Sequence, residues 1–446
     1  MRKLSVQSDK APATEDVCRM LTQLNSAHGV YLDYDRILER RFYYQREKEI
    51  WLSKVKAAMG YSSIHDFDVK RLALDFLSST GLSYYADKTT KGNVSADDAS
   101  IAKVIDSGMA DEKQVRILKI FNYITKCQSM ISLLPGILSM GTLVEENYSW
   151  EGHRMIRLYP DWVEQNTGRF ATRNPAIQNL AHDIQNIITV PNGFRLLHVD
   201  SGQIDPRIIF GAIIKDPQIK YLINLYNDAY YGLLHYATQS QEDYLSGRTD
   251  APKREITEEM KRGRSTLKTL GNAVIYGQTS GNMRDPIVKG YFDRIGNHPA
   301  RKKWQASVEE QIYGGNYIIY TEFDTPVDVR SGSNSTGKYK DASEDAKFKH
   351  MVRAGINARV QGTAADLMKF ACVEQNQLLQ SKWADSYLFL SIHDAIYTAV
   401  AEKEWDDLYE PLAHMPEYYV DDWIPIYAEA EEGISIQSKL WAEEIY

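Results

Sequence analysis

The sequence predicts an α+β fold, because helical and strand-like patterns occupy separate stretches of the chain. Apolar residues recur mostly at helical spacing over 17–130 and again over 206–314. The clearest strand-like runs stand apart from these stretches, at 194–200 and 387–400. A doubly wound sheet would instead alternate strands and helices along the chain, and no internal repeat is visible.

The composition is ordinary for a soluble globular protein. The chain has 446 residues, enough for two to four domains or subdomains. Apolar residues make up 43% and charged residues 25% of the sequence, which is typical of a packed globular chain. No apolar run is long enough to span a membrane, and the N-terminus lacks the apolar segment of a signal peptide. We therefore expect no membrane partner.

The three cysteines indicate a reducing compartment. Cys18, Cys127 and Cys372 lie far apart in the sequence and match no metal-binding spacing. They are interpreted as reduced thiols in the core of a cytosolic protein. We expect the protein in the cytoplasm, or in the host cytoplasm if it is viral.

Charge is distributed unevenly along the chain. The net charge is −8, but residues 402–446 alone hold 13 acidic residues and two lysines. The rest of the chain is therefore net positive, with basic clusters at 36–56, 253–268 and 301–303. Phosphate contacts need such local positive faces rather than a positive total. On charge alone, solvated helix faces explain these clusters equally simply.

The remaining elements follow in order. Residues 1–15 are polar and are expected to be flexible. A loop over 86–99 leads into a capped helix start. The Gly- and Ser-rich segment 330–340 is expected to be a mobile loop, and a helix is predicted over 344–380. The hairpin of residues 387–400 follows, and then one more helix and one strand.

The first candidate catalytic residue is Asp394, between the two apolar strands of this hairpin. The sequence Y-L-F-L-S-I-H-D-A-I-Y-T-A-V spans 387–400. An ionised carboxylate among apolar strands is costly unless a cation compensates its charge, and a metal ion would do so. This interpretation requires a second carboxylate in a similar place.

Asp200 meets that requirement. It ends the apolar run F-R-L-L-H-V at 194–199 and is followed by the polar turn S-G-Q-I-D-P-R. Two aspartates from separate strands can hold two Mg²⁺ ions, as in phosphoryl transfer. Each aspartate alone is weak evidence, because most acids after strands cap turns.

A third candidate is the basic segment K-R-G-R-S-T-L-K-T-L-G-N-A-V-I-Y-G at 261–277. Arg264, Lys268, Asn272 and Tyr276 are spaced four apart and would share one helix face. The two cations could clamp a polyphosphate, and the aromatic ring could stack on a base. An exposed basic helix with a buried tyrosine is about equally consistent with this segment alone.

Together these motifs resemble the polymerase core of family A DNA polymerases, from about residue 17 to the end. Six segments occur in the family's order. They are motif A, V-D-S-G-Q-I-D-P-R (199–207); motif B, R-S-T-L-K-T-L-G-N-A-V-I-Y-G (264–277); motif C, S-I-H-D-A (391–395); T-G-R-F-A-T-R-N-P-A-I-Q-N (167–179); R-A-G-I-N-A-R-V-Q-G-T-A-A-D (353–366); and the thumb-loop segment T-K-G-N-V-S (90–95).

The resemblance implies a right-hand fold with an antiparallel palm sheet. After a flexible segment at 1–15, the thumb and its connecting helices would span 16–150. The palm would combine 151–207 with 345–446, and the fingers would span 208–344.

The resemblance also implies a DNA-directed DNA polymerase that acts on primer-template DNA and dNTPs. With the thumb beginning near residue 17, we expect no exonuclease domain in this chain; a separate exonuclease or a processivity factor could be a partner.

The resemblance assigns roles at the reaction centre. Asp200 and Asp394 would bind two Mg²⁺ ions, or Mn²⁺ in their place, with the Ser201 carbonyl as a further ligand. Lys268 would meet the α-phosphate region and act as general acid toward pyrophosphate. Arg264 would grip the γ-phosphate.

The nucleotide-binding residues would be Gln203, Asp205, Tyr230, Asn272 and Tyr276, with the tyrosine at 276 stacking beside the templating base. Three of these positions depart from the family pattern. Asp205 stands where the family usually has Glu, which blocks the ribose 2′-hydroxyl. Asn272 replaces an aromatic residue, and Tyr230 replaces a histidine that touches the phosphates.

The DNA-binding residues would come from three segments. Arg169 and Gln361 would reach the minor groove at the primer-template end. Arg353 and Asn357 would support the template, and His393 the primer terminus. Motif C also departs from the family: Ala395 replaces a Glu that assists metal and primer placement.

Two rival functions stay open. One is a polymerase that accepts ribonucleotides or resembles a single-subunit RNA polymerase, which shares the aspartates and the Arg/Lys/Tyr helix. The other is a catalytically reduced protein that binds primer-template DNA. The thumb-loop, T-G-R-F-A-T and Q-G-T-A-A-D segments favour the DNA polymerases, and the intact Asp, Lys and Arg residues favour catalysis.

Overall fold

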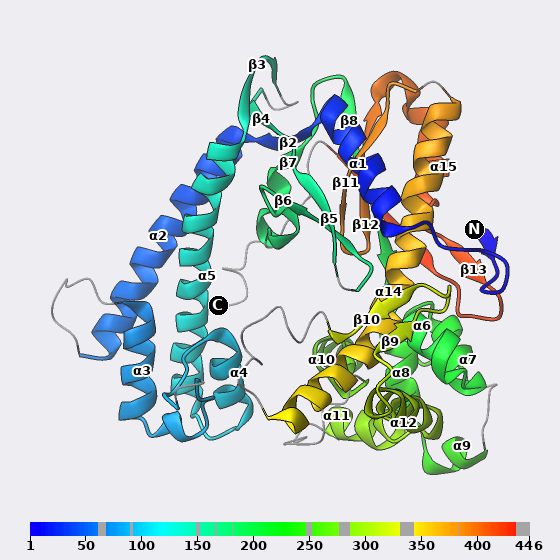
Figure 1. Cartoon of the computed structure of the whole chain (residues 1–446). Helices are drawn as coiled ribbons and strands as arrows, with labels where there is room; N and C mark the ends of the chain where they lie inside the picture. Colours follow the sequence, from blue (N-terminus) through cyan, green and yellow to red (C-terminus); the bar gives the residue numbers. More distant parts are fainter. Residues whose placement is uncertain are drawn as a thin grey trace. The chain divides into compact units, whose positions relative to one another are not determined.

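The computed structural model describes residues 1–60, 68–89, 92–148, 152–165, 167–180, 182–246, 252–275, 286–330, 343–382 and 384–433 (Figure 1). The chain forms two compact units. The first unit combines residues 1–28, 160–178 and 193–433, and the second combines 29–159 with 179–192. Helices and strands are both present in each unit, so the predicted α+β class is confirmed. None of the described helices is long and apolar enough to cross a membrane.

A four-stranded antiparallel sheet lies at the centre of the first unit. Its order is β11 (Tyr387–Ile392), β12 (Ala395–Ala401), β8 (Phe194–Gly202) and β14 (Tyr427–Gly433). Both predicted strand regions are therefore confirmed, and β11 and β12 form the predicted hairpin. The strand β8 continues past Asp200 to Gly202.

The two faces of this sheet differ, because side chains alternate between faces along a strand. On one face, Leu197 and Val199 of β8 pack with residues of the neighbouring strand and helices, namely Leu379, Val400, Trp405, Leu408 and Leu412. Burying each such aliphatic side chain contributes about 1.5–3 kcal/mol. The opposite face of β8 consequently carries His198 and Asp200.

Long helices accompany the sheet. The helix predicted at 344–380 is α14 (Glu344–Ser381), which begins at its N-cap residue Ser343, and α15 (Trp405–Ala413) follows the hairpin. The segment between β8 and α14 is mostly helical: α6 (Ile204–Ile208), η4 (Ile209–Ile214), α7 (Pro217–Tyr226), α8 (Ala229–Thr238), α9 (Gln241–Ser246), α10 (Glu258–Ile275), α11 (Pro286–Tyr291), η5 (Phe292–Gly296) and α12 (Pro299–Tyr313). Most of the predicted loop at 330–340 lies outside the described residues.

Three small sheets complete the first unit. Strands β5 (Asp161–Glu164) and β6 (Phe170–Arg173) pair, as do β9 (Ile318–Tyr320) and β10 (Pro326–Asp328). Strand β1 (Arg2–Leu4) pairs in parallel with β13 (Tyr418–Val420). The flexible segment expected at 1–15 therefore contains a paired strand, and Thr14 already begins helix α1 (Thr14–His28).

The second unit holds most of the region predicted to be the thumb. Helices α2 (Tyr34–Ala58) and α5 (Glu112–Met140) lie side by side in Figure 1, with α3 (Val69–Ser79), η1 (Leu82–Tyr84) and α4 (Asp98–Asp106) nearby. A four-stranded sheet has the order β3 (Thr142–Tyr148), β4 (Arg154–Leu158), β2 (Val30–Asp33) and β7 (Ile188–Thr189), and η3 (His182–Ile187) precedes β7.

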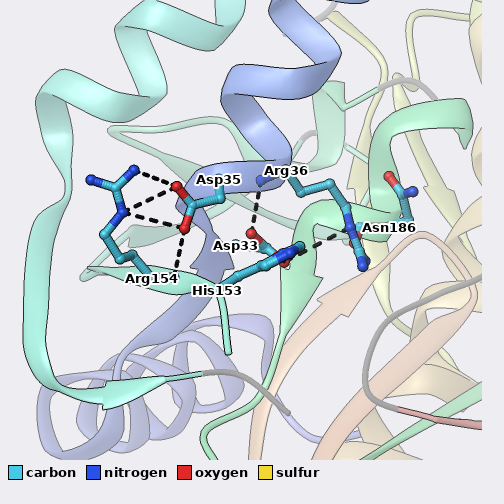
Figure 2. A network of polar contacts seen from close by, with 6 residues as sticks. All are labelled: Asp33, Asp35, Arg36, His153, Arg154 and Asn186. Atoms are coloured by element: carbon cyan, nitrogen blue, oxygen red, sulfur yellow. Dashed lines mark hydrogen bonds and ion pairs between the residues drawn. The ribbon is translucent and has the colours of Figure 1, made fainter. Parts of the chain in front are cut away.

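Figure 2 shows the polar network at the start of α2. Buried Asp33 caps the helix through the Arg36 amide, 2.8 Å away, and its other oxygen lies 2.8 Å from His153 Nδ1. Asp35 pairs with Arg154 of β4, whose Nε lies 3.1 Å from Oδ1. The network attaches α2 to the sheet of its own unit.

The division of the chain into thumb, palm and fingers, with the residue boundaries given above, stays a prediction.

Candidate active site

The structure brings the two predicted metal-binding aspartates together at one end of the central sheet. Asp200 lies opposite Ala395, the first residue of β12. The Ser201 amide donates to the Asp394 carbonyl at 2.9 Å, so the two acidic residues are held next to each other by the backbone. The two-residue turn between β11 and β12 consists of His393 and Asp394, and His393 has a positive φ of 54°. Such turns need positive φ to match the twist of their strands.

The local charges act mainly on Asp200. Burial and the carboxylates of Asp394 and Glu429 raise the pKa of Asp200 to about 6, while Lys268 of α10 opposes the rise. Burial also raises the pKa of Asp394, and Arg169 acts against it. Two close carboxylates in a partly buried setting favour a compensating cation.

This donor set fits a hard divalent cation, because carboxylate and carbonyl oxygens are the ligands that Mg²⁺ prefers. Asp200 and Asp394 would supply the carboxylates, and the Ser201 carbonyl belongs to the same strand end. Within the described ranges, no group of three or more His, Cys, Asp or Glu side chains could hold a metal ion. Any metal bound here would therefore rely on the two aspartates together with backbone or ligand oxygens.

Arg169, predicted to contact DNA, lies directly on the carboxylates. Its Nη2 atom is 3.0 Å from Asp394 Oδ1 and 3.8 Å from Asp205 Oδ1. A tight turn places it, with the Gly168 amide donating to the Gln165 carbonyl at 2.9 Å. Gly168 has a φ of +75°, a conformation that favours glycine. Arg169 thus supplies the positive charge beside Asp394 in this structure.

A pocket lies next to this arginine. The residues that line it are Gln165, Arg169, Phe170, Gln178, Ala365, Met368 and His393. Gln178 is fixed there: its Oε1 accepts from the Thr172 amide at 2.7 Å, and its Nε2 lies 3.4 Å from the Ser391 carbonyl. The pocket therefore joins three of the motif segments that the sequence singled out.

A second group of predicted residues gathers around Asp228, which sequence reasoning did not select. Arg264 donates from Nε and Nη2 to Asp228 Oδ2 at 2.9 and 2.7 Å. Gln203, the residue before α6, donates to the same oxygen at 2.7 Å. Tyr230 is buried, and the Arg264 guanidinium lies 5.8 Å from its ring centre. Asp228 opens the segment D-A-Y at 228–230, in which the resemblance assigns a role only to Tyr230.

The structure describes the other predicted residues of motif B only in part. Lys268 lies on the predicted helix, α10, and its side chain is exposed. Asn272 belongs to α10, but its side chain lies outside the described part of the structure, and Tyr276 lies outside it altogether.

The three predicted DNA contacts of α14, Arg353, Asn357 and Gln361, are spaced four apart and share one stripe of the helix. Arg353 is exposed, and the other two are half-buried. The Asn357 Oδ1 atom is buried and has no hydrogen-bond partner among the described residues. A buried acceptor of this kind is available to a ligand that carries a donor.

Glu429 is the second residue that sequence reasoning missed. It lies opposite Asp200 on β14, on the side away from Ala395, and directly opposed residues share a sheet face. The sequence Y-A-E-A-E-E-G showed an acidic strand, but it could not show which strand it would pair with.

Comparison with known proteins supports the family resemblance. Residues 330–436 match the family model of DNA polymerase family A. The DNA polymerase I of Aquifex aeolicus is 24% identical over 327 residues, which cover 73% of this chain and 50% of the relative. The DNA polymerase I of Streptococcus pneumoniae serotype 4 is 21% identical over 437 residues, covering 91% and 43%. The chain thus spans half or less of the length of these curated relatives.

A solved structure agrees in fold. It is the POL domain of Pol1 from M. smegmatis in complex with DNA primer-template and dNTP. The TM-score is 0.70 at 18% sequence identity, with 94% of this chain and 70% of that chain covered. The predicted polymerase fold and the resemblance to family A DNA polymerases are confirmed.

Proposed function

We propose that this chain, a relative of the family A DNA polymerases, is a template-directed DNA polymerase that extends a primer 3′-hydroxyl with dNTPs. One observation carries the proposal. The register of β8 and β12 brings Asp200 and Asp394 together, and Lys268 of α10 acts electrostatically on Asp200. Paired carboxylates beside a cationic helix are what nucleotidyl transfer requires.

Two Mg²⁺ ions, or Mn²⁺ in their place, are the proposed cofactors. Asp200, Asp394 and the Ser201 carbonyl would hold them. When bound, these ions would lower the pKa of the primer hydroxyl and neutralise charge on the triphosphate. The pKa of Asp200 near 6 means that its carboxylate is largely ionised, and so able to accept a cation, at neutral pH.

The nucleotide would lie against α10. Lys268 and Arg264 stand one turn apart on that helix and would contact the phosphates, with Lys268 placed to donate a proton to the leaving pyrophosphate. Gln203, Asp205 and Tyr230 would complete the site from α6 and α8. Asn272 and Tyr276 are proposed at the sugar and base from their places in motif B.

Primer-template DNA is the proposed partner, and the M. smegmatis neighbour was solved with such a ligand. Arg169 and His393 line the pocket beside Asp394. His393 would meet the primer terminus, and Arg169 with Gln361 would reach the minor groove at the primer-template end. Arg353 and Asn357 of α14 would support the template. The buried Asn357 Oδ1, which has no hydrogen-bond partner within the described part of the chain, supports a contact there. We propose a processivity factor or a separate exonuclease as further partners. We also propose a cytoplasmic location, which the free cysteines support.

Relaxed sugar selection is the second candidate. Asp205 is one methylene shorter than the family's Glu, and Arg169 lies 3.8 Å from it. A carboxylate turned toward an arginine leaves more room at the position of a ribose 2′-hydroxyl. This observation favours acceptance of rNTPs beside dNTPs.

Primer extension on a defined template tests both candidates. The wild type is compared with Asp200→Asn and Asp394→Asn, with dNTPs or rNTPs and with Mg²⁺ or Mn²⁺. Extension with dNTPs that both variants lose supports the proposal. Extension with both sugars supports the relaxed polymerase, and extension with rNTPs alone indicates an RNA polymerase-like activity. Tight primer-template binding without extension contradicts the catalytic proposal.

A further inference from the structure

Asp228 connects three parts of the first unit through its two carboxylate oxygens. Oδ1 accepts from the Tyr231 amide at 2.8 Å and caps α8. Oδ2 accepts from Gln203 at 2.7 Å and from two nitrogens of Arg264 at 2.9 and 2.7 Å. One carboxylate therefore joins the start of α8 to the turn after β8 and to the phosphate-facing helix α10.

The contact with the turn is reciprocal. Gln203 donates through Nε2 to Asp228, and its Oε1 accepts from the Ala229 amide at 2.5 Å. Buried Arg207 adds a backbone contact, with Nη2 donating to the Asn227 carbonyl at 3.3 Å. Residues 227–229 are thus attached at three points to the segment that begins three residues after Asp200.

The pair with Arg264 is partly enclosed. The Asp228 side chain is 15% exposed and that of Arg264 30% exposed. The guanidinium also lies 5.4 Å from the Tyr231 ring centre, within the range of a cation–π contact. Ionised hydrogen-bond partners of this kind are stronger and more directional than neutral ones.

Among the residues that the structure describes, the hydrogen bonds of Arg264 involve only one edge of its guanidinium. Arginine has five N–H donors, and Asp228 takes those of Nε and one on Nη2. The donors of Nη1 lie on the other edge. An anion could bind there while the carboxylate keeps the arginine in place.

We infer that Asp228 is a positioning residue that fixes Arg264 against the motif A turn, so that the free edge of the guanidinium meets the nucleotide's phosphates. The inference deepens the proposed function and rests on it for the identity of the ligand. Asp228 itself does not touch the nucleotide. Its removal lets Arg264 adopt many rotamers, and ordering these on binding weakens the affinity for dNTP.

The opposite effect is physically possible and makes the inference testable. Asp228 could act as a competing anion that occupies Arg264 until the phosphates displace it. In that case its removal would increase dNTP affinity, because a negative charge close to the phosphates would be lost.

The experiment measures equilibrium dNTP affinity on a complex with dideoxy-terminated primer-template, so that no chemistry is needed. Asp228→Ser keeps a side chain that caps helices well but cannot reach Arg264. Asp216→Ser is the matched control, since Asp216 caps α7 in the same way through the Ile219 amide at 2.9 Å. Thermal melting of each variant reports folding, and Asp228→Asn, which keeps the side-chain shape, replaces the serine variant if that variant unfolds.

We expect Asp228→Ser to weaken dNTP binding about tenfold, because Arg264 must then be ordered when the nucleotide binds. Asp216→Ser and the primer-template affinity should stay unchanged. In an Arg264→Ala background, Asp228→Ser should have no further effect. Unchanged or tighter dNTP binding, or a full additional loss without Arg264, overturns the inference. A wild type that binds dNTP but does not extend a free primer contradicts only the proposed function; a wild type that does not bind dNTP overturns both.

Discussion

At the scale of single residues, the site combines acids that repel one another with one arginine that relieves part of the repulsion. Asp200 is enclosed, and burial and its acidic neighbours Asp394 and Glu429 raise its pKa to about 6. Arg169 lies 3.0 Å from Asp394 and therefore reduces the charge of the pair in this structure. Sites arranged for charged ligands often lower the stability of the folded protein.

Neutralising Asp200 should consequently stabilise the protein. The folded-state pKa of about 6 lies above the ordinary value of 3.8, so the cost of ionising Asp200 in the folded protein builds up between these two pH values and is complete above pH 6. We expect Asp200→Asn to raise the free energy of unfolding by about 2–3 kcal/mol at pH 7.5 without added metal. The gain should disappear at about pH 3, which is below both pKa values, so that the wild-type side chain is protonated in both states.

Urea unfolding of both proteins across this pH range measures the effect. Asp422→Asn is a suitable control, because its carboxylate is exposed and its pKa is lowered rather than raised. Equal stability of the wild type and Asp200→Asn at pH 7.5 would show that the raised pKa of Asp200 is not a property of the folded protein.

Among the helices, close packing positions the segment that holds Asp228 and Arg264. Helix α8 begins at Asp228 and packs on α7, and Gly232 makes this packing possible. A Cβ at Gly232 would lie 2.7 Å from the Ile223 amide nitrogen and Cα. Backbone atoms cannot move aside as a flexible side chain can, so the two helices would have to separate.

We therefore expect Gly232→Ala to destabilise the protein by about 1–3 kcal/mol through overpacking. Gly136→Ala is the matched control: this glycine also lies within a helix, α5, and nothing lies within 4 Å of an added Cβ. That variant should be neutral or stabilising by up to about 1 kcal/mol, because alanine favours helix more than glycine does. Chemical denaturation measures both. Equal effects of the two variants would contradict the α7–α8 contact.

Sequence patterns could predict the strands and helices that depend on local periodicity. Apolar runs that end in an acid predicted both Asp200 and Asp394, and four-residue spacing predicted the shared face of Arg264 and Lys268. They could not predict pairings set by distant parts of the chain. Whether β14 would lie beside β8, and so place Glu429 opposite Asp200, depends on sheet order, which no local pattern encodes.

At the largest scale, the first residues of the chain pair with a strand more than 400 residues later in the sequence. Strand β1 pairs with β13, and α1 packs on β5 and β11. The sequence predicted one helical region from residue 17 onward, but the compact units divide at residues 28 and 29. Helical periodicity shows that a helix has an apolar face, but it does not show which distant strands will cover that face.

Because α1 belongs to the first unit, a core substitution in α1 should destabilise the elements of that unit. Leu21 is fully buried, and Leu21→Ala should cost about 2–5 kcal/mol. Hydrogen exchange should accelerate first in β5 and β11, and not in α3 and α5. Leu143→Ala, at a leucine that is 43% exposed in the second unit, should cost little. Faster exchange confined to α3 and α5 in Leu21→Ala would place α1 in the other unit.

The most direct test of the central claim compares binding with chemistry at the paired aspartates. Single-nucleotide incorporation and primer-template affinity are measured side by side for the wild type, Asp200→Asn, Asp394→Asn and the control Asp422→Asn. We expect both site variants to bind primer-template as the wild type does but to lose at least about a thousandfold in incorporation rate, the scale expected when a catalytic electrostatic group is removed. Incorporation that persists in either site variant at the rate of the Asp422→Asn control would show that the paired aspartates are not the catalytic centre.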